Sequence, residues 1–310
     1  MTYRERLVYT WSEDGCFLEG VLIQPEQSSP GRLPLVWVHG MNGCFYEPQV
    51  VAIGRELAEL GHTFVCGNNR GHDSGAIMGL RDGRTFLAGA TWELFDECPY
   101  DIAGWLGYTV ELGFPRVALL GHSLGAHKVG YYQARRRDPR VAGLIAASPS
   151  KRVALVDPEL LALAQRLEAA GRGRELLPGT GDPATGVGAV SAQTYANRAH
   201  AGLDVYGFHT ANPALVSVAC PLLAFYGTEE GEIGGPTELA AIRRSATDAC
   251  QSRRISSPAP TTSTPATRPR LPPPLPPGCG GCQPNRPTPR LLLVLVEWER
   301  LRQGDRREPT

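Results

Sequence analysis

Short apolar runs alternate with amphipathic segments over roughly the first 246 residues. Runs that are apolar on both faces are typical of strands buried in a parallel sheet, and amphipathic segments are typical of the helices that cover it. The pattern therefore predicts an α/β fold with a mostly parallel sheet and helices on both faces. The predicted strands are residues 35–38, 63–66, 117–120, 141–147 and 222–226, and the predicted helices are residues 50–60 and 101–112.

Two further features organise this domain. Residues 6–11 and 17–23, separated by Glu13-Asp14-Gly15, predict a β-hairpin before the parallel strands.

Residues 149–219 interrupt the alternation of strands and helices with a helical piece at 158–170 and a Gly/Pro-rich loop at 171–188. An insertion between two sheet strands lies over the strand ends, where ligands bind, so we interpret it as a cap; the alternative is a surface insertion without a role. Its aromatic residues, candidate substrate contacts, are Tyr195, Tyr206 and Phe208.

The composition changes after the first domain, which we place at residues 1–250. Residues 251–290 are rich in proline and have few large apolar side chains, so they cannot bury enough surface to fold alone and are predicted to be disordered. A short terminal segment follows at residues 291–310. Its apolar beginning, 291–301, is compatible with a strand or a helix.

The balance of charged residues and the apolar stretches of the sequence exclude some classes of partner. The chain has 31 basic and 31 acidic residues and no net charge, which argues against nucleic acid or an anionic membrane as partner. The N-terminus has no apolar signal core and no apolar stretch is long enough to span a bilayer, so we expect a cytoplasmic protein.

Cys279 and Cys282 form a single CxxC pair, which cannot complete a zinc site by itself. No feature calls for a metal or an organic cofactor.

The strongest chemical signal is Gly121-His122-Ser123-Leu124-Gly125, which follows a predicted strand and precedes a predicted helix. In a G-x-S-x-G turn of this kind, the serine hydroxyl projects above the sheet, and the helix N-terminus directs N–H groups at an oxyanion beside it. The pattern is loose, and a chance match is the alternative. Its position between a strand and a helix favours a nucleophilic Ser123.

Three further motifs accompany the serine turn. They are His39-Gly40-Met41 after the third strand, Arg70-Gly71-His72 after the fourth, and Tyr226-Gly227-Thr228-Glu229-Glu230. In this order the four motifs resemble those of the α/β-hydrolase superfamily, over about the first 250 residues. The closest types are single-domain esterases, dienelactone-hydrolase-like and serine-aminopeptidase-like proteins.

The resemblance implies a role for individual residues. Ser123 would be the nucleophile, and the N–H groups of Met41 and Leu124 would form the oxyanion hole. Glu230 would be the acid that orients the base, with Glu229 as the fallback in the same turn. Glutamate stands here where the family usually has aspartate.

The expected catalytic histidine is absent. In this fold the triad follows the chain order serine, acid, histidine, but no histidine follows Glu230. The catalytic histidine is therefore unknown, and His200 and His209 in the insertion are weak substitutes. His62 is expected at the surface, and His127 is expected to serve packing. The remaining histidines are His39, His72 and His122.

The proline-rich tail offers an explanation for this absence. Family members often carry Gly-Ala-Asp-His-Val-Tyr-Thr-Gly around the histidine. When that segment is written in GC-rich codons and the same nucleotides are translated one base later, they encode Ala-Pro-Thr-Thr-Ser-Thr-Pro. This is the sequence of residues 259–265. We hypothesise a shift of reading frame between about residues 248 and 257, which would also remove the last strand and helix of the fold. The alternative is a natural proline-rich tail on a hydrolase that lost its base.

These observations predict a serine hydrolase of small acyl substrates, esters or thioesters, that forms an acyl-enzyme on Ser123 and is impaired in this chain. The alternative is a non-catalytic binding or scaffold protein with the same fold. A weaker interpretation treats residues 271–277 as a polyproline ligand for aromatic grooves.

Overall fold

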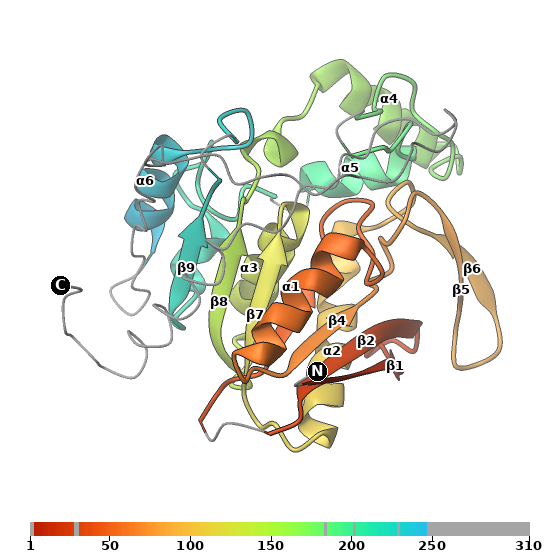
Figure 1. Ribbon diagram of the computed structural model, residues 1–310. Coiled ribbons are helices and arrows are strands. Elements are labelled where there is room, and N and C mark those ends of the chain that lie inside the picture. The colour runs from red at the N-terminus through yellow and green to blue at the C-terminus, as the bar shows by residue number, and fades with distance from the viewer. Residues whose placement is uncertain (1–2, 28–30, 183–184, 201–202, 228–229, 247–310) are drawn as a thin grey trace, which may run out of the picture.

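The computed structural model describes residues 3–27, 31–182, 185–200, 203–227 and 230–246. Within these ranges, seven strands form one sheet in the order β1-β2-β4-β3-β7-β8-β9 (Figure 1). The strands are β1 (Tyr3–Trp11), β2 (Phe17–Pro25), β3 (Leu35–Val38), β4 (Phe64–Gly67), β7 (Val117–His122), β8 (Val141–Ala147) and β9 (Leu222–Phe225).

The sheet is mostly parallel, as the sequence predicts. The β1–β2 and β2–β4 pairs are antiparallel, and the pairs from β4 to β9 are parallel. The predicted hairpin is present, and both of its strands extend farther than expected. The parallel strands bring their carboxyl ends to one edge, so the loops after β3, β4, β7, β8 and β9 gather there.

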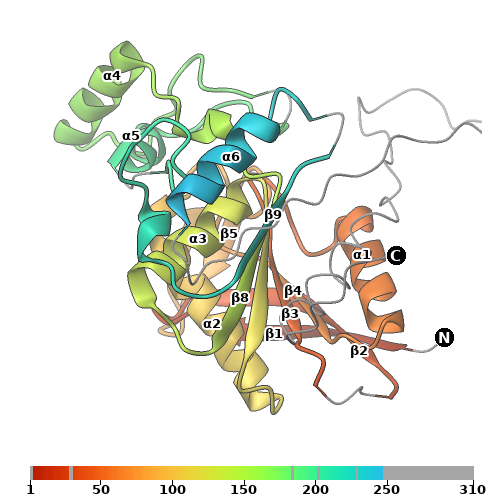
Figure 2. The same cartoon turned by 90° about the vertical axis from the view of Figure 1, so that its left-hand side faces the viewer.

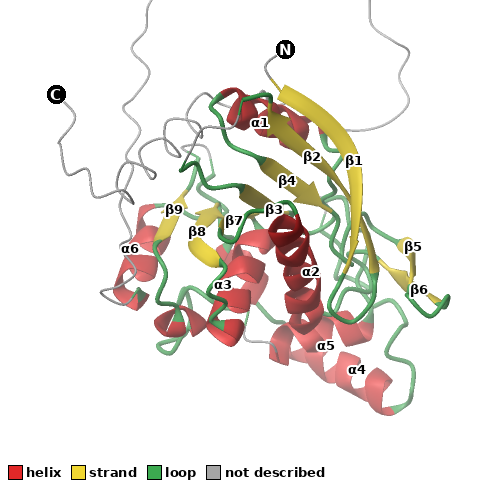
Figure 3. Cartoon of the chain, turned by 90° about the horizontal axis from the view of Figure 1, so that it is seen from below, coloured by secondary structure: helices red, strands yellow, loops and turns green. Residues whose placement is uncertain are grey.

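Helices cover both faces of the sheet. Figure 2 shows α1 on one side and α2, α3 and α6 on the other, and Figure 3 shows the same layers from below. The bounds are α1 (Pro48–Glu59), α2 (Cys98–Glu111), α3 (Leu124–Arg136) and α6 (Pro236–Ser245). A short 3-10 turn, η1 (Phe95–Glu97), leads into α2.

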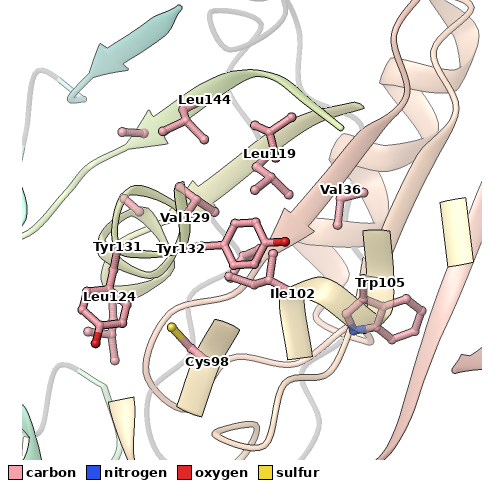
Figure 4. Close-up of a cluster of buried hydrophobic side chains, with 14 of the residues drawn as sticks. Val36, Cys98, Ile102, Trp105, Leu119, Leu124, Val129, Tyr131, Tyr132 and Leu144 are labelled. Carbon is pink, nitrogen blue, oxygen red and sulfur yellow. The ribbon is translucent and has the colours of Figure 1, made fainter. Parts of the chain in front are cut away.

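Alternate residues of the central strands divide the core into two clusters. Leu119 and Leu144 join the cluster under α2 and α3, with Tyr132 and Trp105 (Figure 4). Their neighbours Leu120 and Ile145 join the cluster on the face of α1. Because both faces of each central strand are buried, these strands are apolar without alternation.

Several elements are not apparent from the sequence pattern. The segment after β4 forms a separate hairpin, β5 (Ala76–Gly79) and β6 (Thr85–Ala88). The insertion between β8 and β9 contains α4 and a second helix, α5, that packs against it. Helix α6 follows β9. The elements of the insertion are η2 (Lys151–Ala154), α4 (Pro158–Ala169), α5 (Ala192–His200) and η3 (Ala214–Ser217).

Some sequence predictions fall outside the described residues. They concern the proline-rich stretch, the terminal segment, the single CxxC pair and the hypothesis of a shifted frame, all beyond residue 246, and also the fallback acid Glu229. Among the helices of the described ranges, none combines the length and the apolar character that a membrane span requires.

Candidate active site

Ser123 occupies a strained turn between β7 and α3. Its backbone has φ 55° and ψ −119°, a conformation that non-glycine residues rarely adopt. The turn is held because the Ser123 N–H donates to the carbonyl of Ala147, at 2.9 Å, and Ala126 N–H donates to the carbonyl of Ser123, at 3.1 Å. Strain of this kind persists only where the surroundings determine it fully, and it marks functional turns.

Close backbone packing explains the two glycines of the turn. A Cβ on Gly121 would lie 2.2 Å from the carbonyl oxygen of Gly125. A Cβ on Gly125 would lie 2.0 Å from the carbonyl oxygen of Val38, at the end of β3. Helix α3 therefore begins directly against β3, a contact that a side chain at either position would prevent.

The turn after β3 lies beside the serine. A Cβ added to Gly40 would be 3.1 Å from Ser123 Cβ and 3.5 Å from Leu124 N. The backbone of Met41 thus follows a residue that touches the serine turn. Among the described residues, the N–H groups of Met41 and Leu124 donate no hydrogen bond. Two free donors beside a serine are what an oxyanion requires.

His39 fixes this turn from inside the protein. Its ring is buried, Asn69 N–H donates to Nε2 at 2.9 Å, and Nδ1 donates to Gly40 O at 2.8 Å. The bond from Asn69 assigns the proton to Nδ1. Burial, with the nearby charge of Lys128, holds the pKa of His39 well below its usual value. The ring stays neutral and has both nitrogens occupied, so it positions the turn.

Glu230 stands at the carboxyl end of β9. Its Oε2 accepts hydrogen bonds from Ser148 Oγ, at 2.5 Å, and from Gly227 N, at 2.8 Å. Ser148 directly follows β8, so these contacts hold the carboxylate across the ends of β8 and β9. Desolvation lowers the pKa of His122 below its usual value, and the negative charge of the Glu230 carboxylate opposes this shift only in part.

The structure accounts for the histidines by their surroundings. His127 is buried, with Nε2 bonded to Ser150 O at 3.0 Å, and serves packing as expected. His62 is also buried and contacts Leu33 O, so its predicted surface position is wrong. The reason is that the chain turns inward after α1 to start β4. His72 pairs with Asp73.

No imidazole completes a triad in the described part of the chain, where no hydrogen bond joins a histidine to Ser123 Oγ or to the Glu230 carboxylate. His122 stacks on Trp37, with ring centroids 6.1 Å apart. His209 is exposed and its Nε2 contacts Lys151 O, and His200 is exposed at the end of α5.

The aromatic residues of the insertion have structural contacts. Tyr206 is fully buried, and its hydroxyl donates to Ala126 O on α3. Phe208 stacks on Tyr206, with centroids 6.0 Å apart. The hydroxyl of Tyr195 accepts from Asp157 N at the start of α4. These contacts pack the insertion, and the expected contacts of the three residues with substrate stay predictions.

Two buried charge clusters support the loops beside the serine. Arg70 binds Asp101, at 2.8 Å, together with Asp14 and Glu97. Burial opposes its charge, but these carboxylates raise the pKa of Arg70. On the other side, Lys128 of α3 pairs with Glu93, both completely buried. The sequence signals the first cluster only by its Arg-Gly motif and gives no signal for the second.

A cavity of about 240 Å³ lies away from this site, between the β5–β6 hairpin and the insertion. Arg70, Phe86, Trp92 and Arg174 line it, and Ser123, Met41 and Glu230 do not. Within the described residues, no group of three or more His, Cys, Asp or Glu side chains is arranged to hold a metal ion.

Comparison with known proteins agrees with this geometry. Residues 34–182 match the family model of the alpha/beta hydrolase fold. No curated protein sequence matches the chain. Among solved structures, the α/β-hydrolase GrgF from Penicillium sp. sh18 is 17% identical, with a TM-score of 0.59, covering 80% of this chain and 88% of that one.

Two other structures are similar at the same level. Est1E from Butyrivibrio proteoclasticus, solved with ferulic acid, is 19% identical with a TM-score of 0.54, covering 80% of this chain and 89% of that one. A soluble variant of monoglyceride lipase from Saccharomyces cerevisiae, in complex with a substrate analogue, is 16% identical with a TM-score of 0.54, covering 80% and 84%. At these identities the likeness concerns the fold. With the family match over the segment that contains β3, β4, β7 and the serine turn, it shows that the chain has the α/β-hydrolase fold.

Proposed function

We propose that the protein is a serine hydrolase of small acyl substrates, esters or thioesters, with Ser123 as the nucleophile. The observation that carries this proposal is the strained Ser123 together with the N–H groups of Met41 and Leu124, which donate no hydrogen bond within the described residues. Attack of Ser123 Oγ on the carbonyl carbon would form a tetrahedral oxyanion between these donors. Loss of the alcohol or thiol would leave an acyl-serine, which water releases.

The two N–H donors supply the larger part of the chemistry available here. One such donor lowers the barrier by about 3 kcal/mol, because it is already aimed at the charge that develops. Glu230 is the proposed acid, and its contacts with Ser148 and Gly227 hold it beside the carboxyl ends of β8 and β9.

The component missing from the described residues is a base for the serine proton. A serine hydroxyl is a weak nucleophile without one. We therefore expect slow hydrolysis, at the level that an oxyanion hole and substrate binding support without the triad. The hypothesis of a shifted reading frame explains the loss. It requires that an alternative frame of the gene encodes Asp-His between codons 248 and 265.

The absence of a base also favours the second candidate function, a non-catalytic protein that binds an acyl compound in the same pocket. Ligands of two similar structures, ferulic acid in Est1E and a substrate analogue in monoglyceride lipase, suggest carboxylic acids or their esters for either function.

Chemical rescue separates the two candidates. Hydrolysis of p-nitrophenyl acetate would be measured for the wild type, Ser123→Ala and the control Ser217→Ala, with and without imidazole. We expect imidazole to raise the hydrolysis rate with the wild type and with Ser217→Ala about tenfold more than it raises the rate of the reaction without protein. A base held in position supplies a larger factor, of which free imidazole recovers a small part. An equal rate with Ser123→Ala would contradict the nucleophilic role.

A restored chain extends this test. Correction of the frame near codon 250 should give activity without imidazole, and that activity should disappear with Ser123→Ala. If every variant, including the frame-restored protein, binds the acetate ester saturably but does not hydrolyse it, the result would favour the non-catalytic binding function.

A further inference from the structure

Asn42 connects three parts of the molecule beside the proposed oxyanion hole. It directly follows Met41 and adopts a left-handed backbone conformation, with φ 61°. Its Nδ2 donates to the carbonyl of Thr185 in the insertion, at 2.8 Å. Its Oδ1 accepts from Ser74 Oγ in the loop after β4, at 3.0 Å. Because a carbonyl only accepts and the amide oxygen cannot donate, the two partners fix the orientation of the amide.

The insertion also contacts Met41 itself. Thr185 Oγ1 lies 3.6 Å from Met41 Sδ. The side chain of Met41 packs on a small buried cluster that includes Val187 and Val190. At Gly186, with φ 71°, a Cβ would stand 3.4 Å from Asn42 Nδ2, so the backbone of the insertion approaches the amide closely.

The segment 185–190 is also held at its end by hydrogen bonds that do not involve Asn42. Val190 N donates to Thr180 Oγ1, at 3.0 Å, and Leu177 N donates to Val190 O, at 2.9 Å. The next residue, Ser191, donates its N–H to Thr91 O, at 2.8 Å. A firmly held segment can restrain a turn that it contacts.

We propose that Asn42 is a positioning residue that fastens the turn bearing the Met41 N–H to residues 185–190. The turn and this segment of the insertion then become ordered together, and the insertion supports the oxyanion hole. The kinetic consequence rests on the proposed function of Ser123, whereas the coupling itself does not.

Three variants separate the contacts. Asn42→Asp keeps the shape and the bond from Ser74 but places a carboxylate oxygen against the Thr185 carbonyl. Asn42→Gly keeps the left-handed backbone without strain and removes both side-chain bonds. Ser74→Ala is the matched control, because it removes one bond to the amide and leaves the bond to Thr185.

Hydrogen exchange measured by mass spectrometry on the full chain tests the coupling without any need for activity. Asn42→Asp and Asn42→Gly should raise exchange about fivefold or more both in peptides covering 38–45 and in peptides covering 185–191. Helix α4 should not change, and Ser74→Ala should leave 185–191 unchanged. Unchanged exchange at 185–191 in both Asn42 variants would overturn the proposal, and so would a uniform rise throughout the protein.

The rate of phosphonylation of Ser123 by a p-nitrophenyl phosphonate tests the positioning role. Asn42→Asp should lower the maximal rate about tenfold with half-saturation unchanged, since the oxyanion donor is displaced and the binding surface is not. A normal rate in a variant with raised exchange would refute positioning. If the wild type is not labelled at all, the proposed function fails, and the exchange result still decides whether Asn42 fastens the two segments.

Discussion

The two sides of Ser123 are constructed differently. On the side of β3 and β7, the turn is enclosed by backbone contacts at Gly40, Gly121 and Gly125, none of which leaves room for a side chain without a shift. On the side of β8 and β9, the carboxylate of Glu230 is held by one hydroxyl and one N–H. The conformation of the first side is determined by steric exclusion, and the position of the carboxylate on the second side by two hydrogen bonds.

This difference has a chemical meaning. Groups that stabilise an oxyanion must be in place before the reaction, because reorganisation at that moment would cancel their benefit. The acid acts only through a histidine that it orients. In the proposed function, the side with Glu230 (the acid side) has no further task without that histidine, whereas the side with Gly40 and Gly125 (the oxyanion side) keeps its proposed role. Four measurements of the free energy of unfolding test this difference between the two sides and the packing around them.

The largest effect is expected from Gly125→Ala. Its Cβ would be 2.0 Å from Val38 O, a backbone atom that cannot move without separating α3 from β3. We expect a loss of more than about 4 kcal/mol, or failure to fold. The matched control is Gly107→Ala in α2, where a Cβ meets nothing within 4 Å and alanine should stabilise the helix by about 0.5–1 kcal/mol. Urea denaturation with circular dichroism measures both, and a loss below about 1 kcal/mol for Gly125→Ala would contradict steric enclosure.

The second effect concerns the two lysines of the chain. Lys128, on α3, is completely buried against Glu93, whereas the side chain of Lys151 is 35% exposed. Lys128→Met leaves Glu93 unpaired in the interior and should cost about 3–5 kcal/mol. Lys151→Met should cost about 1 kcal/mol or less. The same denaturation experiment compares them, and addition of Glu93→Leu to Lys128→Met should recover most of the loss. Absence of recovery would show that packing, and not charge, is the cause.

The third effect is a dependence on pH that arises from His127, which connects α3 to the loop after β8. Burial lowers the pKa of His127 to about 4, whereas an unfolded histidine titrates near 6.5. Between these values the unfolded chain binds a proton that the folded chain does not, so stability falls as the pH falls from about 6.5 to about 4. The total is about 3 kcal/mol.

Denaturation across this pH range should show a smaller slope for His127→Gln than for the wild type, and His39 contributes in the same direction. A slope unaffected by His127→Gln would mean that the imidazole is accessible to protons in the folded state.

The smallest effect is expected on the acid side. Ser148→Ala removes the hydroxyl that donates to Glu230 and should cost about 1 kcal/mol. Ser148→Gly loses the same bond but relieves the left-handed backbone at this position, with φ 50°, so it should cost less. Thermal unfolding suffices for this comparison. A loss comparable to that of Gly125→Ala would show that the acid side is as rigidly determined as the oxyanion side.

The sequence predicted the sheet well and the loops poorly. Strands such as residues 35–38 and 141–147 were located to the residue, because a strand buried on both faces must be apolar throughout. The β5–β6 hairpin and α5 were missed, because they are short and packed locally, and their residues show no clear period. The surface position expected for His62 was wrong because burial depends on where the chain turns.

For the candidate site, the sequence identified Ser123, Met41, Leu124 and Glu230 through motifs, and their catalytic roles stay predictions. It did not indicate that Lys128 pairs with Glu93, since 35 positions separate them. It assigned Tyr206 to a substrate surface, whereas the hydroxyl of this residue is bonded to α3.

By itself, the sequence determined the chain order of the seven strands of the main sheet, the position of the serine turn and the absence of a histidine after Glu230. These features depend on local periodicity, on steric rules for glycine and on the order of residues. Only the tertiary structure decided that Gly125 rests on Val38, that Glu230 is held by Ser148, and that Asn42 joins the turn after β3 to the insertion. Each of these contacts joins residues far apart in the chain, and only the packed sheet brings them within bonding distance.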